Sequence, residues 1–563
     1  MRTHAPALLA ALSILVAPVA ARAGSQPLRA KHGMVVSQQF AASQVGVEVL
    51  WEGGNAVDAA VATAFALAVV HPSAGNVGGG GFLLLRPAKG EPIAYDFRET
   101  APARATPTMF LSEGRYDKER HHEGLLSAGV PGTVAGLHLA WKEHGTLPWK
   151  RLVAPAIGLA EEGFPVTEEL ARDLRRVLPE LLKHPASRAA FTREGKPYEA
   201  GDLLVQKDLA STLKRIADKG PAGFYEGETA RLLVKEMERG GGLVTLADLA
   251  AYRPKVRIPV RGQYRGHDVI SMPPPSSGGT ALIQMLNILE QDDLGAMGFR
   301  SAASVHLITE AMRRAFADRA RHMGDPDHNP DMPMTRLLSK DYARELRRTI
   351  DPQRASVSSP SSFEWPAESE ETTHLSVVDD QRNAVALTYT LEAGYGSKIV
   401  VPGAGFLLNN EMGDFNAGPG LTDETGLIGT EPNLAAPGKR MLSSMAPTIL
   451  AKDGTLRLVT GTPGGRTIIN TVLHTILNVV DYGMNVQQAV DAPRFHHQWL
   501  PDVVRYERHG LSPDTLALLT ERGHRLEPIG IQGVVAAIAF DREKGVLEGA
   551  ADRRWADSAA AGR

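Results

Sequence analysis

The sequence predicts a folded globular protein of mixed α/β class, and three features lead to this prediction. Of its 563 residues, 43% are hydrophobic and 22% are charged, proportions typical of a chain with a large core. Residues 140–350 show the apolar spacing of helices, whereas residues 372–390 alternate as strands do. At about 150 residues per domain, the length suggests three or four domains. We expect a soluble enzyme.

Composition excludes several classes of function. The chain has no Cys, which excludes disulfides, thiolate zinc sites, Cys-bound iron–sulfur clusters and a Cys nucleophile. Lys and Arg number 61 against 64 Asp and Glu, a net charge of −3, so the chain lacks the basic field that attracts nucleic acid.

The first residues are typical of a secretory signal. Arg2 and His4 precede the apolar run 5–19, and Ala21-Arg22-Ala23 supplies a small-x-small cleavage site. This run is shorter than the roughly 20 residues of a membrane span, and its terminal place argues against a buried core helix. We therefore predict a signal peptide over residues 1–23 and a periplasmic protein that is not membrane-bound, with secretion into the medium as the alternative.

The first predicted elements of the mature chain are a core helix and a strand. Asn55 is a good N-cap for a helix over residues 56–70, and Pro72 stops it. The glycine-rich stretch 75–81 then precedes the apolar strand 82–85. Because no Gly-Lys-Ser/Thr follows, this is not a phosphate-binding loop, and we expect the glycines to permit close backbone packing.

After the mainly helical stretch, the pattern changes at a linker. The run 272–279 is a stiff turn ahead of a helix that starts near Thr280. Residues 351–371, rich in Ser, Pro and acid, are the most linker-like part of the chain. Two alternating runs, 372–378 and 384–390, then predict a hairpin whose first strand begins at Thr372.

A second strand pattern, over residues 456–460, leads into the Gly461–Gly465 turn and a helix from about Arg466 to Asp481. Such a turn at a helix N-terminus presents backbone N–H groups to an anion or oxyanion.

Common catalytic motifs are absent from the sequence. It has no Gly-x-Ser-x-Gly nucleophile elbow and no His-Glu-x-x-His zinc motif. The adjacent pairs His121-His122 and His496-His497 are expected to be structural, and no metal or cofactor is predicted.

Thr372 offers another kind of nucleophile. If the chain were cut between Glu371 and Thr372, the new α-amine, with an unperturbed pKa of about 7.7–8.0, could help to deprotonate the hydroxyl of the same residue. A Thr that opens a strand is usually only a β-former, so the residues alone leave both interpretations open.

The segment Thr372-Thr373-His374-Leu375-Ser376-Val377-Val378-Asp379 resembles the start of the small subunit of γ-glutamyltransferases (γ-glutamyl transpeptidases). Further segments resemble family motifs in the same order, and the likeness runs from about Leu28 to the C-terminus. These segments are Gly53–Ala60, Gly75–Phe82, Asp96–Glu99, Thr388–Leu391, Leu408–Met412 with Asp414-Phe415, Leu442–Met445 and Thr462–Gly465.

The resemblance implies a fold and a maturation step. The fold is the four-layer αββα sandwich of N-terminal-nucleophile hydrolases, built from both halves of one precursor. The Thr372 hydroxyl attacks the Glu371 carbonyl, and water then splits the ester. The products are a large subunit, residues 24–371, and a small subunit, residues 372–563, which pair as a heterodimer.

The resemblance also implies the roles of the site residues. Thr372 attacks the γ-carbonyl of glutathione or another γ-glutamyl compound, and water, an amino acid or a dipeptide accepts the acyl group. Thr390 orients Thr372, and the backbone N–H groups of Gly464 and Gly465 bind the oxyanion. The residues expected to bind the substrate are Arg98, Ser443 and Ser444 for its α-carboxylate, and Asp414, Glu411 and Glu392 for its α-ammonium.

Two departures from the family and two alternatives remain. Some members carry Asn and Gln at the positions of Glu392 and Glu411, and some bacterial relatives have a gating Tyr where this chain has Thr425 in its predicted lid. A glutaryl- or cephalosporin-type acylase of the same fold is one alternative, although a glutaryl group has no ammonium for Asp414. A non-catalytic, uncut periplasmic binding protein is the other.

Overall fold

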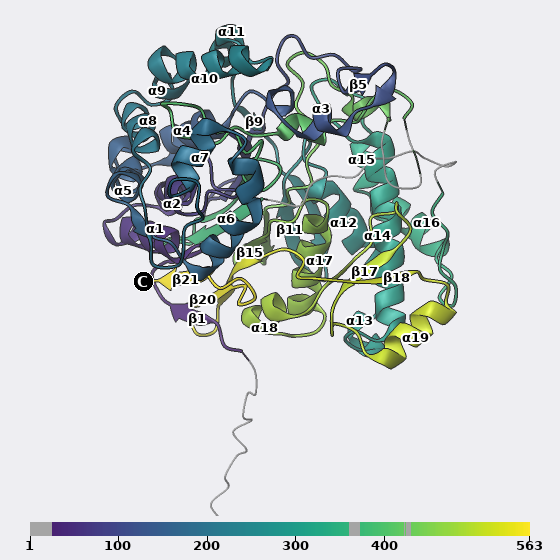
Figure 1. The fold of residues 1–563 in the computed structure, drawn as a ribbon. Coiled ribbons are helices and arrows are strands. Elements are labelled where there is room, and N and C mark those ends of the chain that lie inside the picture. The colour runs from purple at the N-terminus through teal and green to yellow at the C-terminus, as the bar shows by residue number, and fades with distance from the viewer. Residues whose placement is uncertain (1–24, 360–371, 422, 424–428) are drawn as a thin grey trace, which may run out of the picture.

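The computed structural model describes residues 25–359, 372–421, 423 and 429–563. Two seven-stranded sheets lie face to face between two layers of helices (Figure 1). This four-layer αββα sandwich confirms the predicted fold class. The predicted signal peptide, Glu371 and lid residue Thr425 lie outside the described residues.

The first sheet carries the predicted hairpin. Its strand order is β21 (Ala559–Gly562), β2 (Met34–Ser37), β12 (Thr373–Val378), β13 (Ala384–Thr390), β3 (Gly80–Arg86), β4 (Ile93–Phe97) and β9 (Lys255–Arg257), all antiparallel. Strands from both sides of the predicted cut therefore alternate within one sheet.

The second sheet mixes the two halves in the same way. Its order is β1 (Leu28–Ala30), β20 (Val546–Ala551), β19 (Ala536–Asp541), β15 (Thr455–Gly461), β14 (Thr448–Lys452), β11 (His267–Ser271) and β10 (Val260–Tyr264). A smaller sheet of β16 (Phe495–His496), β17 (Val504–Glu507) and β18 (Leu526–Ile529) lies beside this core.

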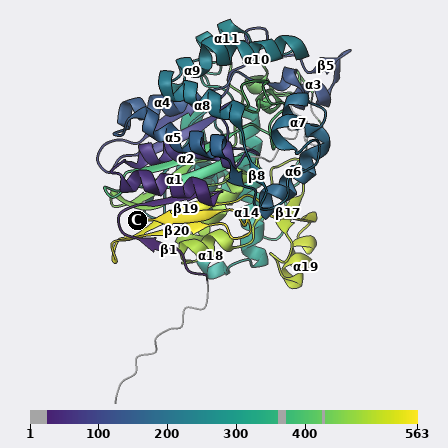
Figure 2. The same cartoon turned by 60° about the vertical axis from the view of Figure 1, so that its left-hand side comes forward.

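Helices cover the outer face of each sheet. The layer over the first sheet contains α1 (Phe40–Trp51), α2 (Ala56–Val70), α4 (Thr133–His144), α5 (Trp149–Glu162) and α8 (Lys207–Lys219). The layer over the second contains α12 (Gly278–Leu289), α14 (Ala302–His322), α16 (Lys340–Arg348), α17 (Thr467–Val480), α18 (Val486–Asp491) and α19 (Pro513–Glu521). Figure 2 shows α1 and α2 on one side of β19 and β20 and α18 on the other.

The remaining helices extend these layers. They are α3 (Lys118–His122), α6 (Glu168–Leu181), α7 (Pro185–Phe191), α9 (Ala222–Tyr225), α10 (Gly227–Gly240), α11 (Leu246–Ala251), α13 (Leu294–Met297) and α15 (Met334–Leu337). No helix among the described residues combines the length and the apolar character needed to cross a bilayer.

The apolar strand β3 shows why two sheets pack together. Leu83 and Leu85 belong to the cluster under the first helix layer, whereas Phe82 and Leu84 belong to the cluster shared with the second sheet. A strand buried on both faces is apolar at every position, which explains the continuous run seen in the sequence.

The glycines around the start of β3 are structural, as expected. A Cβ atom on Gly79 would lie 2.0 Å from the carbonyl oxygen of Thr390, and one on Gly81 would lie 2.4 Å from that of Thr388. These glycines therefore let the backbone of β13, the strand that carries Thr390, approach closely.

Other expectations are confirmed with small shifts. Helix α2 has the predicted bounds, with a capping box between Asn55 and Asp58. Strand β12 begins at Thr373, one residue later than predicted, and helix α12 begins at Gly278, two residues earlier than predicted.

The prediction missed strands β9, β10 and β11 inside the mainly helical region. Gly262 breaks the alternation of β10, and the partner of β11 is the distant strand β14.

Candidate active site

The hairpin β12–β13 brings Thr372 and Thr390 together. Its register pairs Thr373 with Tyr389, which places Thr372 opposite Thr390 at the open end. Opposite residues of an antiparallel pair project to the same face. Both side chains are buried, and the Thr390 hydroxyl accepts a hydrogen bond from the Glu392 backbone N–H (2.8 Å).

The predicted glycine turn reaches the same place from the second sheet. A Cβ atom on Gly461, the last residue of β15, would lie 2.3 Å from the His374 ring, two residues beyond Thr372. Gly464 and Gly465 follow, with φ angles of 128° and 52° that favour glycine. Their turn leads directly into α17, at whose N-terminus backbone N–H groups lack intrahelical partners.

Two pockets meet at Thr372. The smaller holds about 20 Å³, room for about one water molecule. It is lined by Arg98, Thr372, Thr390, Glu392, Glu411, Asp414, Ser443, Ser444, Met445, Gly465 and Ile468. It thus gathers every predicted catalytic and substrate-binding residue except Gly464. Gly464 and Thr372 also line the larger pocket, of about 680 Å³.

Arg98 is the cation of the small pocket. It directly follows β4, is fully buried, and donates hydrogen bonds to the carboxylates of Glu411 and Asp414. Burial lowers its pKa, but the attraction of Glu411 and Asp414 outweighs burial, so the pKa is raised and the guanidinium stays charged. The residues predicted for the substrate's carboxylate and ammonium therefore pair with each other here.

Carboxyl groups outnumber cations around Arg98. Glu99 is fully buried, with Oε2 3.7 Å from Arg98 Nη1, and burial raises its pKa to about 8 against the opposing effect of Arg98. Burial also raises the pKa of Glu411 well above its ordinary value, with Glu99 and Asp414 adding to the effect. Both shifts favour the protonated form of a carboxyl group beside Arg98.

The serine pair is held by the preceding half of the chain. The Ser443 carbonyl oxygen accepts two hydrogen bonds from Ser277, one from the backbone N–H of Ser277 (2.8 Å) and one from its hydroxyl (2.7 Å). Arg319 Nη2 donates to the Ser444 hydroxyl at 3.0 Å, and the Met445 N–H donates to the Ser443 hydroxyl at 3.1 Å. The turn singled out at 272–279 thus supports the substrate side of the site.

His122 is a neighbour of the site that the sequence did not indicate. Its Nδ1 atom lies 3.2 Å from Glu392 Oε1, and Asn410 donates to the other oxygen of the same carboxylate. Glu392 has a φ of 79°, a conformation that non-glycine residues rarely adopt and that occurs at functional sites. His122 and Glu392 are 270 residues apart, and no local pattern could have paired them.

His374 is close to Thr372 in sequence but is not a candidate base. Its Nδ1 atom lies 2.7 Å from the Thr388 hydroxyl and its Nε2 atom 3.1 Å from the Ser376 hydroxyl. Burial lowers the pKa of His374 to about 3, so the ring is neutral. The buried His496 and His497, expected to be structural, bond to neighbouring side chains, as do many core histidines.

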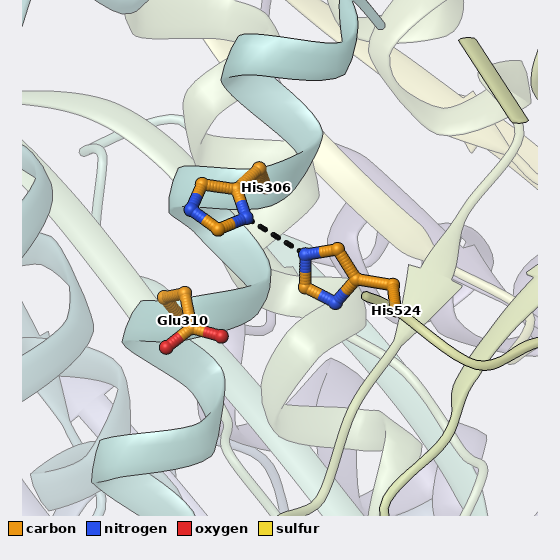
Figure 3. Close-up of side chains that lie close together, drawn as sticks. All are labelled: His306, Glu310 and His524. Carbon is orange, nitrogen blue, oxygen red and sulfur yellow. Dashed lines mark hydrogen bonds between the residues drawn. The ribbon is translucent and has the colours of Figure 1, made fainter. Parts of the chain in front are cut away.

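One group of residues of metal-ligand type occurs in the described part of the chain, away from these pockets. His306 and Glu310 lie on successive turns of α14 and face His524 (Figure 3). The two rings bond to each other (2.7 Å), and Arg313 and Arg314 both pair with Glu310. Two guanidinium groups already neutralise the carboxylate, so we assign no metal to this group.

The comparisons with known proteins identify the family. The family model described as gamma-glutamyltranspeptidase matches residues 42–562. A glutathione hydrolase proenzyme of Escherichia coli is 49% identical, over 95% of this chain and 93% of its own length. An acylase ACY 1 proenzyme of a Pseudomonas species is 39% identical, over 93% of both chains.

The solved structures that match this chain include an acylase and a gamma-glutamyltranspeptidase. Cephalosporin acylase from Bacillus halodurans matches with a TM-score of 0.85 and 28% identity, over 98% of this chain and 99% of its own. The gamma-glutamyltranspeptidase of Helicobacter pylori matches with a TM-score of 0.56 and 48% identity, over 57% of this chain and 92% of that one. As its sequence predicted, the chain belongs to the γ-glutamyltranspeptidase family of enzymes.

Proposed function

We propose that the chain is a self-cleaving γ-glutamyltransferase and glutathione hydrolase with Thr372 as its nucleophile. The observation that carries this proposal is the place of Thr372, between a small acidic pocket around one guanidinium and a larger pocket beside the glycine turn. The relatives named glutathione hydrolase proenzymes support both the activity and maturation from a precursor.

Maturation supplies the catalytic base. In the uncut chain the nitrogen of Thr372 is an amide, and the neighbouring His374 is neutral and bonded on both ring nitrogens. The Thr372 hydroxyl attacks the Glu371 carbonyl, the C–N bond breaks as the amine is released, and water hydrolyses the resulting ester. The new α-amine then serves the Thr372 hydroxyl as its base.

The small pocket selects a zwitterionic head group. The α-carboxylate of a γ-glutamyl substrate takes the place of Asp414 and Glu411 on Arg98, and the α-ammonium takes the place of Arg98 on these carboxylates. Ser443 and Ser444 add hydroxyl groups for the carboxylate, and Glu392 adds a third acid for the ammonium. Because the pocket holds only about 20 Å³, the Arg98–Asp414 pair must open when substrate binds.

Acyl transfer then uses both pockets. The Thr372 hydroxyl attacks the γ-carbonyl, and the N–H groups of Gly464 and Gly465 bind the oxyanion. The amine of the substrate takes a proton and leaves through the larger pocket of about 680 Å³. Water, an amino acid or a dipeptide enters by the same route and takes the γ-glutamyl group from the enzyme.

A glutaryl or cephalosporin acylase is the second candidate. The structural match to cephalosporin acylase supports it, but the acylase relative is 39% identical to this chain, against 49% for the glutathione hydrolase proenzyme of Escherichia coli. The acidic residues Glu392, Glu411 and Asp414 favour a substrate with an ammonium group.

For the whole protein, we propose export to the periplasm by residues 1–23.

Intact mass and N-terminal sequencing of the purified protein test this proposal. We expect two chains from the wild type, the smaller beginning Thr-Thr-His-Leu. The control Thr373→Ser, at a residue whose hydroxyl bonds to no described residue, should be cut at the same bond, with its smaller chain beginning Thr-Ser-His-Leu. Thr372→Ala is expected to stay as one inactive chain. A wild type that remains uncut, or Thr372→Ala that still splits at this bond, would refute the mechanism.

A further inference from the structure

A buried polar network holds residues 351–358, which precede the predicted cut. One side of the network is α14, whose His306, Glu310 and Arg313 share a face. His306 Nε2 lies 2.8 Å from the Asp351 carbonyl oxygen, and the Ser356 N–H donates to Glu310 at 3.2 Å. Arg313 donates to the hydroxyl of Ser358. Helix α14 thus contacts this stretch at Asp351, Ser356 and Ser358.

The other side of the network comes from beyond the predicted cut. The Ser358 N–H donates to Asp502 at 2.7 Å, and the Ala355 N–H donates to the Arg522 carbonyl oxygen at 2.7 Å. Asp502 also bonds to Arg313, at 2.5 Å, and His524 bonds to His306, at 2.7 Å (Figure 3). Residues of both predicted subunits therefore form hydrogen bonds with the same stretch of chain.

The hydrogen bonds of this network are stronger than those of a surface contact, because the side chains that form them are largely buried and several of them are charged. Glu310 is fully buried, and His306, Arg313 and His524 are nearly so. The pKa of Glu310 is lowered to about 2, because Arg313 and Arg314 outweigh the effect of burial, and the carboxylate therefore stays charged. Hydrogen bonds to charged groups of this kind are stronger than neutral ones.

The network is separate from the catalytic machinery. His306, Glu310, Arg313, Asp502 and His524 line neither pocket at Thr372. Thirteen residues, 359–371, join Ser358 to Thr372. The network therefore fixes the chain upstream of the predicted cut, while β12 fixes it immediately downstream.

We propose that these five residues form a clamp that positions the chain for its own cleavage, an inference that rests on the proposed self-cleavage at Thr372. The clamp fixes one end of the thirteen residues that lead to the bond before Thr372, and a tether with fixed ends has fewer conformations to search before that bond meets the Thr372 hydroxyl. It is a positioning device for maturation only, because the matured site binds its substrate elsewhere.

The expected effect follows from the cost of misplacing reacting groups. A displacement of 1 Å costs on the order of 10²-fold in rate. We therefore expect a broken clamp to slow cleavage by about tenfold or more, while kcat/KM of the matured enzyme on a γ-glutamyl anilide stays at the wild-type level.

The test follows cleavage in pulse-labelled full-length chains by the loss of the uncut mass. Asp502→Asn removes the charge that holds Ser358 and Arg313, and Ser358→Ala is a milder variant in case the first fails to fold. The control Asp481→Asn breaks another ion pair between the two halves, with Arg265 (2.6 Å), on a different contact surface. Each rate is normalised to soluble, folded protein.

The outcomes separate the two proposals. Slow cleavage in the clamp variants, with normal cleavage in the control and normal kcat/KM after maturation, supports the clamp. Clamp variants that cleave as fast as the control overturn it. If the wild type itself does not split before Thr372, the proposed function fails, and the clamp proposal fails with it.

Discussion

Replacing Asp414 by Asn tests whether the site recognises an α-ammonium group through this residue. The Asp414 side chain is 12% exposed and pairs with Arg98. Loss of a charge-assisted hydrogen bond to a buried ammonium costs about 2–3 kcal/mol, which corresponds to about a 30- to 150-fold fall in kcat/KM. The same change removes a competitor for Arg98, so a substrate with a carboxylate but no ammonium should bind as well or better.

The assay compares a γ-glutamyl anilide with a glutaryl anilide, which share a leaving group and differ in the α-ammonium. We expect Asp414→Asn to lower kcat/KM on the first substrate only, with maturation unchanged by intact mass. The control Asp325→Asn changes a buried acid outside the pocket, which accepts a hydrogen bond from the backbone N–H of Arg440 (2.9 Å). This variant should keep the wild-type preference for the γ-glutamyl substrate. Equal losses on both substrates in Asp414→Asn would refute the reasoning.

Three further predictions concern the oxyanion, a buried carboxyl and the base. In Gly464→Ala the new Cβ would lie 2.5 Å from the Thr467 hydroxyl, at a φ of 128°, so the turn must shift and kcat should fall by about 10²–10³; an unchanged kcat would remove Gly464 from the oxyanion site. Burial raises the pKa of Glu99 from 4.5 to about 8, so its contribution to stability is complete below pH 4.5 and is lost as the pH rises through 8. Urea unfolding at pH 5 and pH 9 should therefore show the wild type losing on the order of 4 kcal/mol more than Glu99→Gln, and equal losses would contradict the shift. Finally, kcat/KM for hydrolysis should rise with pH through about 7.7–8.0, as the α-amine of Thr372 loses its proton, and a fall over this range would exclude that base.

Local sequence signals predicted the elements around Thr372, the proposed nucleophile. The alternation of β12 and β13, the cap of α2 and the glycine turn before α17 each depend on neighbouring residues, and the structure has all of them. Strands β10 and β11 were missed because they are short, lie among helices, and owe their place in the sheet to β14, far along the chain. A pairing of that kind leaves little trace in a local window.

The composition of the small pocket was predictable from ordered motifs, but its internal contacts were not. The resemblance named Arg98, Glu411 and Asp414, and the structure brings them together across 313 and 316 residues. That Arg98 pairs with both acids, and that His122 reaches Glu392, follows from the packing of loops at the ends of different strands. Sequence order contains no information on such distances.

The arrangement of strands explains why the proposed cut would not take the protein apart. In the first sheet β12 and β13, which follow Thr372, lie between β2 and β3, which precede it, and both junctions are antiparallel ladders. Arg98 comes from before the predicted cut, and Glu411 and Asp414 come from after it, so the pocket needs both products. Breaking the bond before Thr372 removes no strand from either sheet. It creates a carboxylate on Glu371 and changes the nitrogen of Thr372 from an amide into an amine beside the hydroxyl that, in the proposed mechanism, it deprotonates.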